Sequence, residues 1–406
     1  MVARIGLLLI ASLLAWPVGG AHAATLHIRT SGDDRTGDGS AARPWKSPQK
    51  ALENVNPGDT VLLGDGVYVG DLSIRRGGAE GAYVVLRSDH SRLAKIVGMR
   101  YSAINVKANY VEIDGLDIKS AEGHGIAATD VHHIHVLRNR LHHCGGSGFQ
   151  GNSGDYYLVE DNIADHNAAT NRFHCSGISI YQARAIADKK PGIHNIVRGN
   201  LCYANMEVSV RGDHTDGNGI IIDDFHNSQG KSAAGPYPFQ TLVENNLCYD
   251  NGSKGIHVYL SDHVTVCNNT CYWNNRDEKN QGTWRAELSN IQASDNRWSR
   301  NIAWANPDYH RDNMAILDAS MGRNDQNAGV VWSDNLTYNG KPGQSSVRVI
   351  NSPSTITAAN GNQLGVDPRF VRPAVEDGDF HVRSDSSAVD AKGKAKGALT
   401  ALQKAP

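Results

Sequence analysis

Three aspartates flank a short apolar run in the middle of the chain, one before it and two after it: Asp216, Asp223 and Asp224. Three carboxylates this close in sequence repel one another unless a cation lies among them. Ca²⁺ accepts oxygen ligands in irregular cages, so the spacing predicts a calcium site. The ligand spacing of an EF-hand is absent. The alternative is that these residues are turn formers in solvated loops, a role that Asp and Asn commonly fill.

A lysine, Lys254, follows about thirty residues later in the segment Gly-Ser-Lys-Gly-Ile-His-Val. If the fold brings it beside the aspartates, its commonest role is that of a structural counter-charge. It can also act as a base, because a bound cation disfavours the protonated amine and lowers its pKa. The aspartates oppose that shift, so the sequence leaves both roles open.

The elements that would position these residues belong to a repeat. Its pattern is an asparagine, an apolar residue or Thr, a small residue, a polar or aromatic residue and a second asparagine. The first asparagines of the units are Asn139, Asn162, Asn200, Asn246, Asn269, Asn301 and Asn335. The shortest interval between them is 23 residues and occurs twice, which indicates coils of about that length with insertions in some of them.

Each unit carries two short segments in which apolar residues alternate. One follows a glycine, as in Gly255-Ile-His-Val, and the other precedes the asparagine, as in Leu242-Val-Glu-Asn-Asn. Strands this short cannot bury a face alone, but stacked coils can. The repeat therefore predicts an all-β fold, a right-handed parallel β-helix, with the repeated asparagines stacked as a ladder.

This solenoid aligns residues of neighbouring coils. Lys254 is expected above Asn218, because each precedes the glycine of its coil, and His257 is expected above Ile221. Lys254 then lies one rung from the acidic cluster. One position in three consecutive coils is occupied by cysteine: Cys202, Cys248 and Cys271. A strand spacing of about 4.8 Å permits a disulfide without requiring one, and we expect buried thiols there.

The two ends differ from the repeats. Residues 44–53 predict a short helix that caps the N-terminal end of the solenoid, and residues 366–390 predict a final coil. No Pro/Ser-rich linker is present, so residues 24–406 are expected to form a single domain. A solenoid can be this large because it grows along one axis.

The N-terminus has the layout of a secretory signal peptide. Arg4 supplies the positive charge, residues 5–16 form the apolar core, and Ala21-His22-Ala23 is a small-x-small cleavage site, so residues 1–23 are the predicted signal. The apolar run is too short to span a bilayer. The mature protein is therefore expected to be secreted or periplasmic, with no membrane contact after cleavage. The formal net charge of −2 excludes a polyanion-coating protein, so no nucleic-acid partner is expected. We expect a monomer.

Two segments, Pro57-Gly-Asp-Thr-Val and Asp367-Pro-Arg-Phe, stand near the two ends of the predicted solenoid. Together with the repeat, they resemble the first and last coils of the pectate-lyase-like superfamily of right-handed β-helices. That superfamily includes lyases, hydrolases, epimerases and phage or adhesin stalks. The resemblance therefore implies the fold and leaves the function open.

The segment Ser253-Lys254-Gly255-Ile256 is similar to the lysine segment of family nine of the polysaccharide lyases, a branch of that superfamily. The resemblance implies that Lys254 abstracts a proton and that the three aspartates named above bind Ca²⁺ as a cofactor. Two departures stand out. Asn218 occupies a position where the family has an aspartate, and the family's paired acids precede the glycine of the coil, whereas here they follow the strand.

Lyase chemistry fits these residue types. A uronate C5 proton is weakly acidic because the sugar carboxylate resists further negative charge. A cation on that carboxylate eases its removal, after which β-elimination opens the 4-linked bond. Insertions at 168–175, 182–193, 206–217 and 226–240 mark a working face. The candidate residues for binding an acidic polysaccharide are Arg172, His174, Tyr181, Arg211 and His257.

Three other functions stay open. A hydrolase would use a pair of carboxylates, and His214-Thr-Asp-Gly with Asp223-Asp224 superficially resembles segments of polygalacturonases. A uronate epimerase shares the proton abstraction of a lyase. A non-enzymatic carbohydrate-binding or adhesive solenoid would need no lysine beside an acidic cluster.

Overall fold

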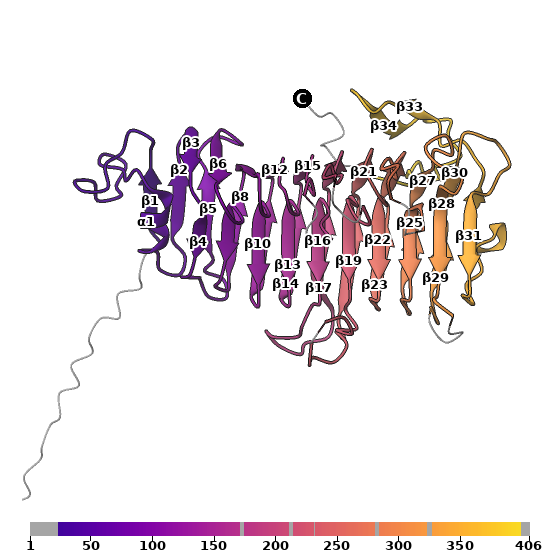
Figure 1. The fold of residues 1–406 in the computed structure, drawn as a ribbon, viewed down its shortest axis with the longest axis horizontal. Coiled ribbons are helices and arrows are strands. Elements are labelled where there is room, and N and C mark those ends of the chain that lie inside the picture. Colours follow the sequence, from indigo (N-terminus) through magenta and orange to yellow (C-terminus); the bar gives the residue numbers. More distant parts are fainter. Residues whose placement is uncertain are drawn as a thin grey trace, which may run out of the picture.

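The computed structural model describes residues 23–170, 174–210, 214–230, 232–280, 284–322 and 327–398. It is a parallel β-helix whose coils stack side by side along one long axis (Figure 1). The predicted signal peptide lies outside the described residues except for Ala23. Within the described ranges, no helix is long and apolar enough to cross a membrane.

A typical coil contributes one strand to each of three parallel sheets, which we call A, B and C in the order in which the chain visits them. Sheet A stacks β1 Thr25–Ile28, β2 Thr60–Leu63, β5 Val84–Ser88, β8 Val111–Asp114, β11 His132–Leu137, β14 Asp155–Glu160, β17 Ile193–Arg198, β20 Gln240–Glu244, β23 Val264–Cys267, β26 Arg297–Ser299 and β29 Val331–Ser333. Sheet B stacks β3 Gly66–Val69, β6 Ala94–Gly98, β9 Asp117–Ser120, β12 Arg140–His142, β15 Ile163–Asp165, β18 Leu201–Tyr203, β21 Leu247–Tyr249, β24 Thr270–Tyr272, β27 Ile302–Trp304, β30 Leu336–Tyr338 and β32 Gln363–Leu364. Sheet C stacks β4 Leu72–Ile74, β7 Ile104–Val106, β10 Ile126–Thr129, β13 Phe149–Asn152, β16 Ile178–Tyr181, β19 Ile220–Asp223, β22 Ile256–Tyr259, β25 Ala286–Ile291, β28 Met314–Ala319 and β31 Val347–Ile350.

Alternation along each strand separates the core from the outer surface. In β22, Ile256 and Val258 are fully buried in the interior of the β-helix, while His257 and Tyr259 line a cavity on its outer surface. Many corners between strands are made by single residues with a left-handed backbone, such as Asn268 with φ 54°. Asn, Asp and His tolerate that conformation better than most residues, which explains their frequency in the repeat.

The predicted asparagine ladder is confirmed at the corner between sheets A and B. Each side-chain amide donates to Oδ1 of the next asparagine, as Asn200 Nδ2 does to Asn246 Oδ1 at 2.9 Å. The rungs are Asn139, Asn162, Asn200, Asn246, Asn269, Asn301, Asn335 and Asn362. The ladder satisfies buried backbone groups at every turn, because each side chain also bonds the main chain.

A second ladder runs along the corner between sheets B and C, and it uses the second asparagine of each unit. Its rungs are Asn167, Asn205, Asn251 and Asn274. It ends on a carboxylate, because Asn274 donates its backbone N–H to Glu287 Oε1 at 3.0 Å. Glu287 is fully buried, and burial raises its pKa to about 8.

The predicted cysteine register is also confirmed. Cys202 lies next to Cys248, and Cys248 next to Cys271, at equivalent positions of successive strands in sheet B. All three are free thiols with no exposed surface, as expected for small residues packed in the interior.

The two ends of the solenoid are closed differently. Helix α1, Pro48–Leu52, lies within the predicted capping segment and buries Ala51 and Leu52 against the first coil. The C-terminal segment differs from the predicted final coil, because β33 Phe370–Arg372 and β34 Asp379–Val382 form an antiparallel hairpin. Phe380 stacks at a tilt on Tyr249, so the hairpin covers aromatic side chains on the outside of sheet B.

Candidate functional site

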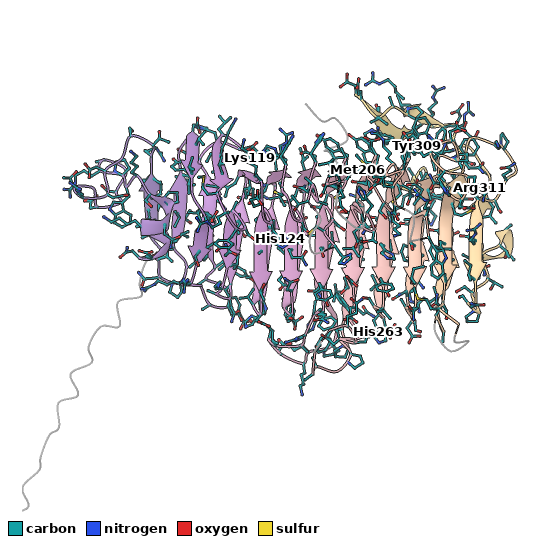
Figure 2. The ribbon with its side chains drawn as sticks, viewed as in Figure 1. Lys119, His124, Met206, His263, Tyr309 and Arg311 are labelled. Carbon is teal, nitrogen blue, oxygen red and sulfur yellow. The ribbon has the colours of Figure 1, made fainter. Side chains whose placement is uncertain are left out.

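A cavity of about 960 Å³ lies on the outer face of sheet C. It crosses the middle coils, where the predicted insertions interrupt the repeat. Its lining residues are His124, Gln150, Asn152, His174, Ser179, Tyr181, Thr215, Asp216, Ile221, Asp223, Gln229, Lys254, His257, Tyr259, Trp284, Ile291 and Met321. In Figure 2, His124 lies over the face of this sheet and Met206 lies at the edge where its strands begin.

Two outward rows of side chains form the floor of the cavity. Strand register aligns Ser179, Ile221 and His257 in one row. It aligns Tyr181 and Asp223 in the next row. The predicted position of His257 above Ile221 is therefore confirmed. Because outward residues repeat every second position, a polar site can be built here without disturbing the apolar interior.

Asn218 joins the acidic and basic groups at one end of these strands. Its Nδ2 donates to Asp216 Oδ1 at 2.7 Å, and its Oδ1 accepts the backbone N–H of Lys254 at 3.1 Å. The amide also donates to Ser176 Oγ at 3.1 Å. The predicted stacking of Lys254 on Asn218 is thus confirmed. An amide at position 218 bridges two coils and orients Asp216 through a donated hydrogen bond.

Lys254 lines the cavity, although the residue is only 3% exposed. Burial lowers the pKa of its amine to about 8, the charge of Asp216 opposes this shift, and Arg285 adds to it. Desolvation therefore outweighs the nearby carboxylate, which the sequence alone did not decide. At neutral pH a useful fraction of this amine is uncharged.

Asp216 and Asp223 face the same cavity but have opposite electrostatic environments. Burial works against the charge of Asp216, but a hydrogen bond from His174 and the charge of Lys254 keep its pKa below the usual range. His174 Nδ1 lies 3.4 Å from Asp216 Oδ2. Burial, reinforced by Asp216 and Asp224, raises the pKa of Asp223 well above its usual range. The two carboxyl groups therefore differ in acidity: the surroundings favour the charged form of Asp216 and disfavour the charged form of Asp223.

Asp224 has a different environment from the other two aspartates. It is fully buried and absent from the cavity lining. Its Oδ1 accepts hydrogen bonds from the backbone and hydroxyl of Ser228, and its Oδ2 accepts them from Gln182 and Gln229. Three of these bonds come from the loop after β19, at Ser228 and Gln229, and the fourth comes from Gln182, which follows β16. The structure therefore brings Asp216 and Asp223 to the cavity and leaves Asp224 to hold the loop.

The predicted substrate-binding residues fall into two groups. His174, Tyr181 and His257 line the cavity. Burial, reinforced by Lys254, lowers the pKa of His257 to about 3, so its imidazole is neutral, and Nδ1 is buried without a hydrogen-bond partner among the described residues. Arg172 and Arg211 lie outside the described residues.

The loop before β19 is anchored by a buried ion pair. His214 Nδ1 lies 2.5 Å from Asp277 Oδ2, and its Nε2 donates to the carbonyl of Ser209 at 2.9 Å. Glu207 accepts the backbone N–H of His214 at 2.9 Å. These contacts fix the segment that presents Asp216, so the acidic residue stands on a supported loop.

Several cavity residues were missed by the sequence analysis: His124, Gln150, Asn152, Thr215 and Trp284. Gln150 and Asn152 were detectable, because the glycine-based register places them beside Ser179 and Tyr181. Trp284 follows an irregular insertion, and no repeat position indicated that it would reach the cavity.

The chemistry of the donor set fits a hard cation in one respect. The described residues supply two carboxylates facing one cavity, and Asp223 Oδ1 is buried with no hydrogen-bond partner among them. Such an oxygen, beside a second acid, matches the oxygen ligands that Ca²⁺ takes in proteins. Asp216 and Asp223 would hold such an ion.

The comparisons with known proteins bear on the fold. A family model described as "Pel9A-like, right handed beta helix region" matches residues 26–178, a span that ends before Asp216, Asp223 and Lys254. A search of curated protein sequences finds no match. The family match therefore does not include these three residues, and only the geometry of the cavity identifies them as candidate site residues.

Among solved structures, the pectate lyase Pel9A is similar with a TM-score of 0.55 and 14% identity, over 93% of this chain and 96% of that chain. A rhamnogalacturonan lyase gives a TM-score of 0.51 and 12% identity, over 86% and 90% of the two chains. An alginate lyase from Paenibacillus sp. str. FPU-7 gives 0.46 and 16%, over 84% and 95%. At these identities the two similarities with a TM-score above 0.5 show the fold alone, and with the family model they confirm the predicted right-handed parallel β-helix.

Proposed function

Because the chain has the right-handed parallel β-helix fold of the pectate-lyase-like superfamily, we propose that it is a carbohydrate-active enzyme. More specifically, we propose a polysaccharide lyase that cleaves a uronate-containing polymer by β-elimination, with Lys254 as the base. The observation that carries this proposal is the amine of Lys254, which lines the cavity with 3% exposure and a pKa lowered to about 8.

In the proposed elimination, Lys254 supplies the base and solvent supplies the proton for the leaving group. The neutral amine of Lys254 takes the C5 proton, the C4–C5 double bond forms, and the bond between C4 and the glycosidic oxygen breaks. The proton passes from carbon to nitrogen, and the leaving oxygen is protonated from solvent. Tyr181 and Tyr259 line the cavity on either side of Asp223 and offer ring faces to a sugar.

We propose Ca²⁺ as the cofactor, held by Asp216 and Asp223. When bound, the ion would neutralise the uronate carboxylate and so favour loss of the C5 proton. Asn218 fixes the orientation of Asp216 in either case, through the hydrogen bond from its Nδ2. We further propose that residues 1–23 direct export of the chain, which would place it where extracellular polysaccharides occur.

The test of the lyase proposal is the product. Incubation with a panel of uronate polymers, with and without a chelator, should yield unsaturated uronate ends that absorb in the ultraviolet. Lys254→Ala should abolish that absorbance while circular dichroism shows an unchanged fold. New reducing ends without the absorbance would contradict elimination.

One observation favours a second candidate, a glycoside hydrolase. Asp216 and Asp223 have pKa values moved in opposite directions, which is the arrangement of a base and an acid in such enzymes. In that case Asp223→Asn would abolish formation of reducing ends, and Lys254→Ala would leave the bond-breaking chemistry in place.

A further inference from the structure

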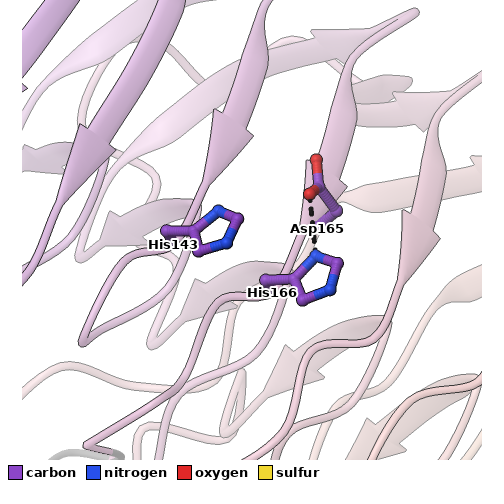
Figure 3. A group of neighbouring side chains, drawn as sticks. All are labelled: His143, Asp165 and His166. Atoms are coloured by element: carbon purple, nitrogen blue, oxygen red, sulfur yellow. Dashed lines mark hydrogen bonds and ion pairs between the residues drawn. The ribbon is translucent and has the colours of Figure 1, made fainter. Parts of the chain in front are cut away.

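A second group of ionisable side chains lies away from the cavity, at the corner that follows sheet B (Figure 3). His143 follows β12, Asp165 ends β15, and His166 comes next. One potential ligand atom from each of the three residues lies within 4.8 Å of the others. Asp165 is buried and both histidines are exposed, so the two imidazoles are accessible from solvent.

Strand register makes the two histidines equivalent. β12 and β15 pair His142 with Asp165, so His143 and His166 occupy the same corner in successive coils. Both have a left-handed backbone, with φ values of 50° and 53°. Their rings stack with centroids 4.9 Å apart and planes 8° apart. Equivalent ring atoms therefore face one another across one coil spacing.

Hydrogen bonding fixes which nitrogen of His166 carries the proton. Its Nδ1 lies 2.9 Å from Asp165 Oδ2. Arg140 donates two hydrogen bonds to the same carboxylate, at 3.0 and 3.1 Å. These bonds keep the Asp165 carboxylate ionised, so that it can only accept hydrogen bonds. Nδ1 of His166 must therefore donate. In the neutral ring, Nε2 keeps its lone pair.

A longer relay has the same effect on His143. Asp117 Oδ1 accepts from His142 Nε2 at 2.9 Å, so the neutral His142 ring has its lone pair on Nδ1. That nitrogen lies 2.9 Å from His143 Nδ1, which must then donate. Nε2 of His143 is left with its lone pair as well. Two stacked, exposed imidazoles thus present unprotonated Nε2 atoms side by side.

We propose that His143 and His166 form a binding site for a borderline divalent transition metal ion, of the Zn²⁺, Ni²⁺ or Cu²⁺ class, ligated through both Nε2 atoms. Imidazole nitrogen suits these ions, and hard Ca²⁺ does not compete for it. Asp165 and His142 are positioning residues, because an acceptor on the far nitrogen orients a ligating histidine and raises its basicity. Water molecules would occupy the remaining coordination positions of the ion.

Binding requires both rings to reorient, because in stacked rings the two Nε2 lone pairs point in nearly parallel directions. Metal–nitrogen bonds of about 2.0–2.1 Å require the two Nε2 atoms to approach to roughly 3–3.4 Å, closer than stacked rings stand. Because both rings are exposed, they can tilt toward each other at their Nε2 ends while the Nδ1 hydrogen bonds hold their bases. The proposal concerns a face distinct from the cavity and does not depend on the proposed lyase function.

A neighbouring corner supplies a matched control. His133 has the same local contact, with its Nδ1 2.8 Å from His132 Nδ1. Its ring, however, stacks between Tyr110 and Tyr156, so no second imidazole faces it across a coil. A histidine in that setting should contribute little to binding an ion.

The experiment is a calorimetric titration of tag-free full-length protein with Cu²⁺ or Zn²⁺, in saturating Ca²⁺ to fill any hard-cation site. One ion per chain should bind. His143→Ala and His166→Ala should each weaken binding at least about tenfold, Asp117→Asn by about tenfold, and His133→Ala should leave it unchanged. Nitrogen couplings from two imidazoles in the Cu²⁺ paramagnetic resonance spectrum should disappear in the double His143→Ala, His166→Ala variant.

Any one of three results would overturn the proposal, and the first two concern the double variant and the wild type. One is unchanged affinity in the double variant, provided that circular dichroism shows the variant folded. The other is a wild-type protein that binds neither ion. An equal loss of affinity in His133→Ala would also contradict it, because it would assign the binding to scattered surface histidines.

Discussion

The exchange of Lys254 for arginine separates a catalytic base from a structural counter-charge. Burial lowers the pKa of the amine from 10.5 to about 8. At pH 7 that raises the neutral fraction from about 0.03% to about 10%, a gain of roughly 300-fold in available base. A guanidinium keeps the positive charge beside Asp216 but stays protonated at every accessible pH. Lys254→Arg therefore preserves the electrostatics and removes the base.

If Lys254 is the base, Lys254→Arg should lower kcat by about 10²–10⁴-fold, the usual contribution of general base catalysis. The wild-type rate should rise with pH through an ionisation near 8. Lys254→Ala should be inactive, and small primary amines added to the assay should restore part of its rate. The assay is the initial rate of unsaturated product formation between about pH 6 and 10, with substrate saturating.

The refuting result is a Lys254→Arg enzyme that keeps more than about a tenth of wild-type kcat with the same pH profile. That outcome would assign Lys254 the role of counter-charge to Asp216, and the acidic pair would then carry the chemistry. Thermal unfolding of the variant is the control, since a lowered Tm would explain lost activity without any role in proton transfer.

Three further predictions follow from buried polar groups. Glu287→Gln should flatten the pH dependence of stability, because the raised folded-state pKa makes the wild type lose stability as the pH rises from about 4.5 to about 8. In denaturant unfolding, the variant and the wild type should have similar unfolding free energies at low pH, and the variant should be the more stable of the two at high pH. Asn200→Ala should lower the unfolding free energy by about 2–4 kcal/mol, because it leaves several buried ladder groups unpaired. The control, Asn339→Ala in an outer turn, should lower it by less than about 1 kcal/mol, and equal losses would contradict a stabilising ladder. Asp223→Asn should weaken Ca²⁺ binding, measured by calorimetry, at least tenfold. Asp224→Asn should weaken it far less, because the Asp224 carboxylate accepts hydrogen bonds from the loop, and the reverse order would reassign the ligands.

The sequence was sufficient to predict the repeat and its register. Spacing of the glycines and asparagines placed Lys254 on Asn218 and His257 on Ile221, and the structure has both alignments. This succeeded because stacked coils repeat a local conformation, and equivalent residues then lie one strand spacing apart. The ladder was predictable for the same reason.

The sequence failed where the chain leaves the repeat. The segment 366–390 carries strand-like patterns, but its hairpin is decided by the aromatic side chains it covers on sheet B. Asp224 follows Asp223 directly, yet one carboxylate faces the cavity and its neighbour bonds a loop. Strand alternation reverses side-chain direction at each residue, and the conformation of an insertion decides which acid meets solvent.

Sequence by itself therefore determined the solenoid, the coil length and the set of residues that share a rung. Only the tertiary structure decided the chemical state of those residues. The pKa of Lys254 depends on desolvation by all surrounding groups, including Arg285 from the next coil, and on its balance with Asp216. Such sums depend on distance and burial in three dimensions, whereas register depends only on counting along the chain.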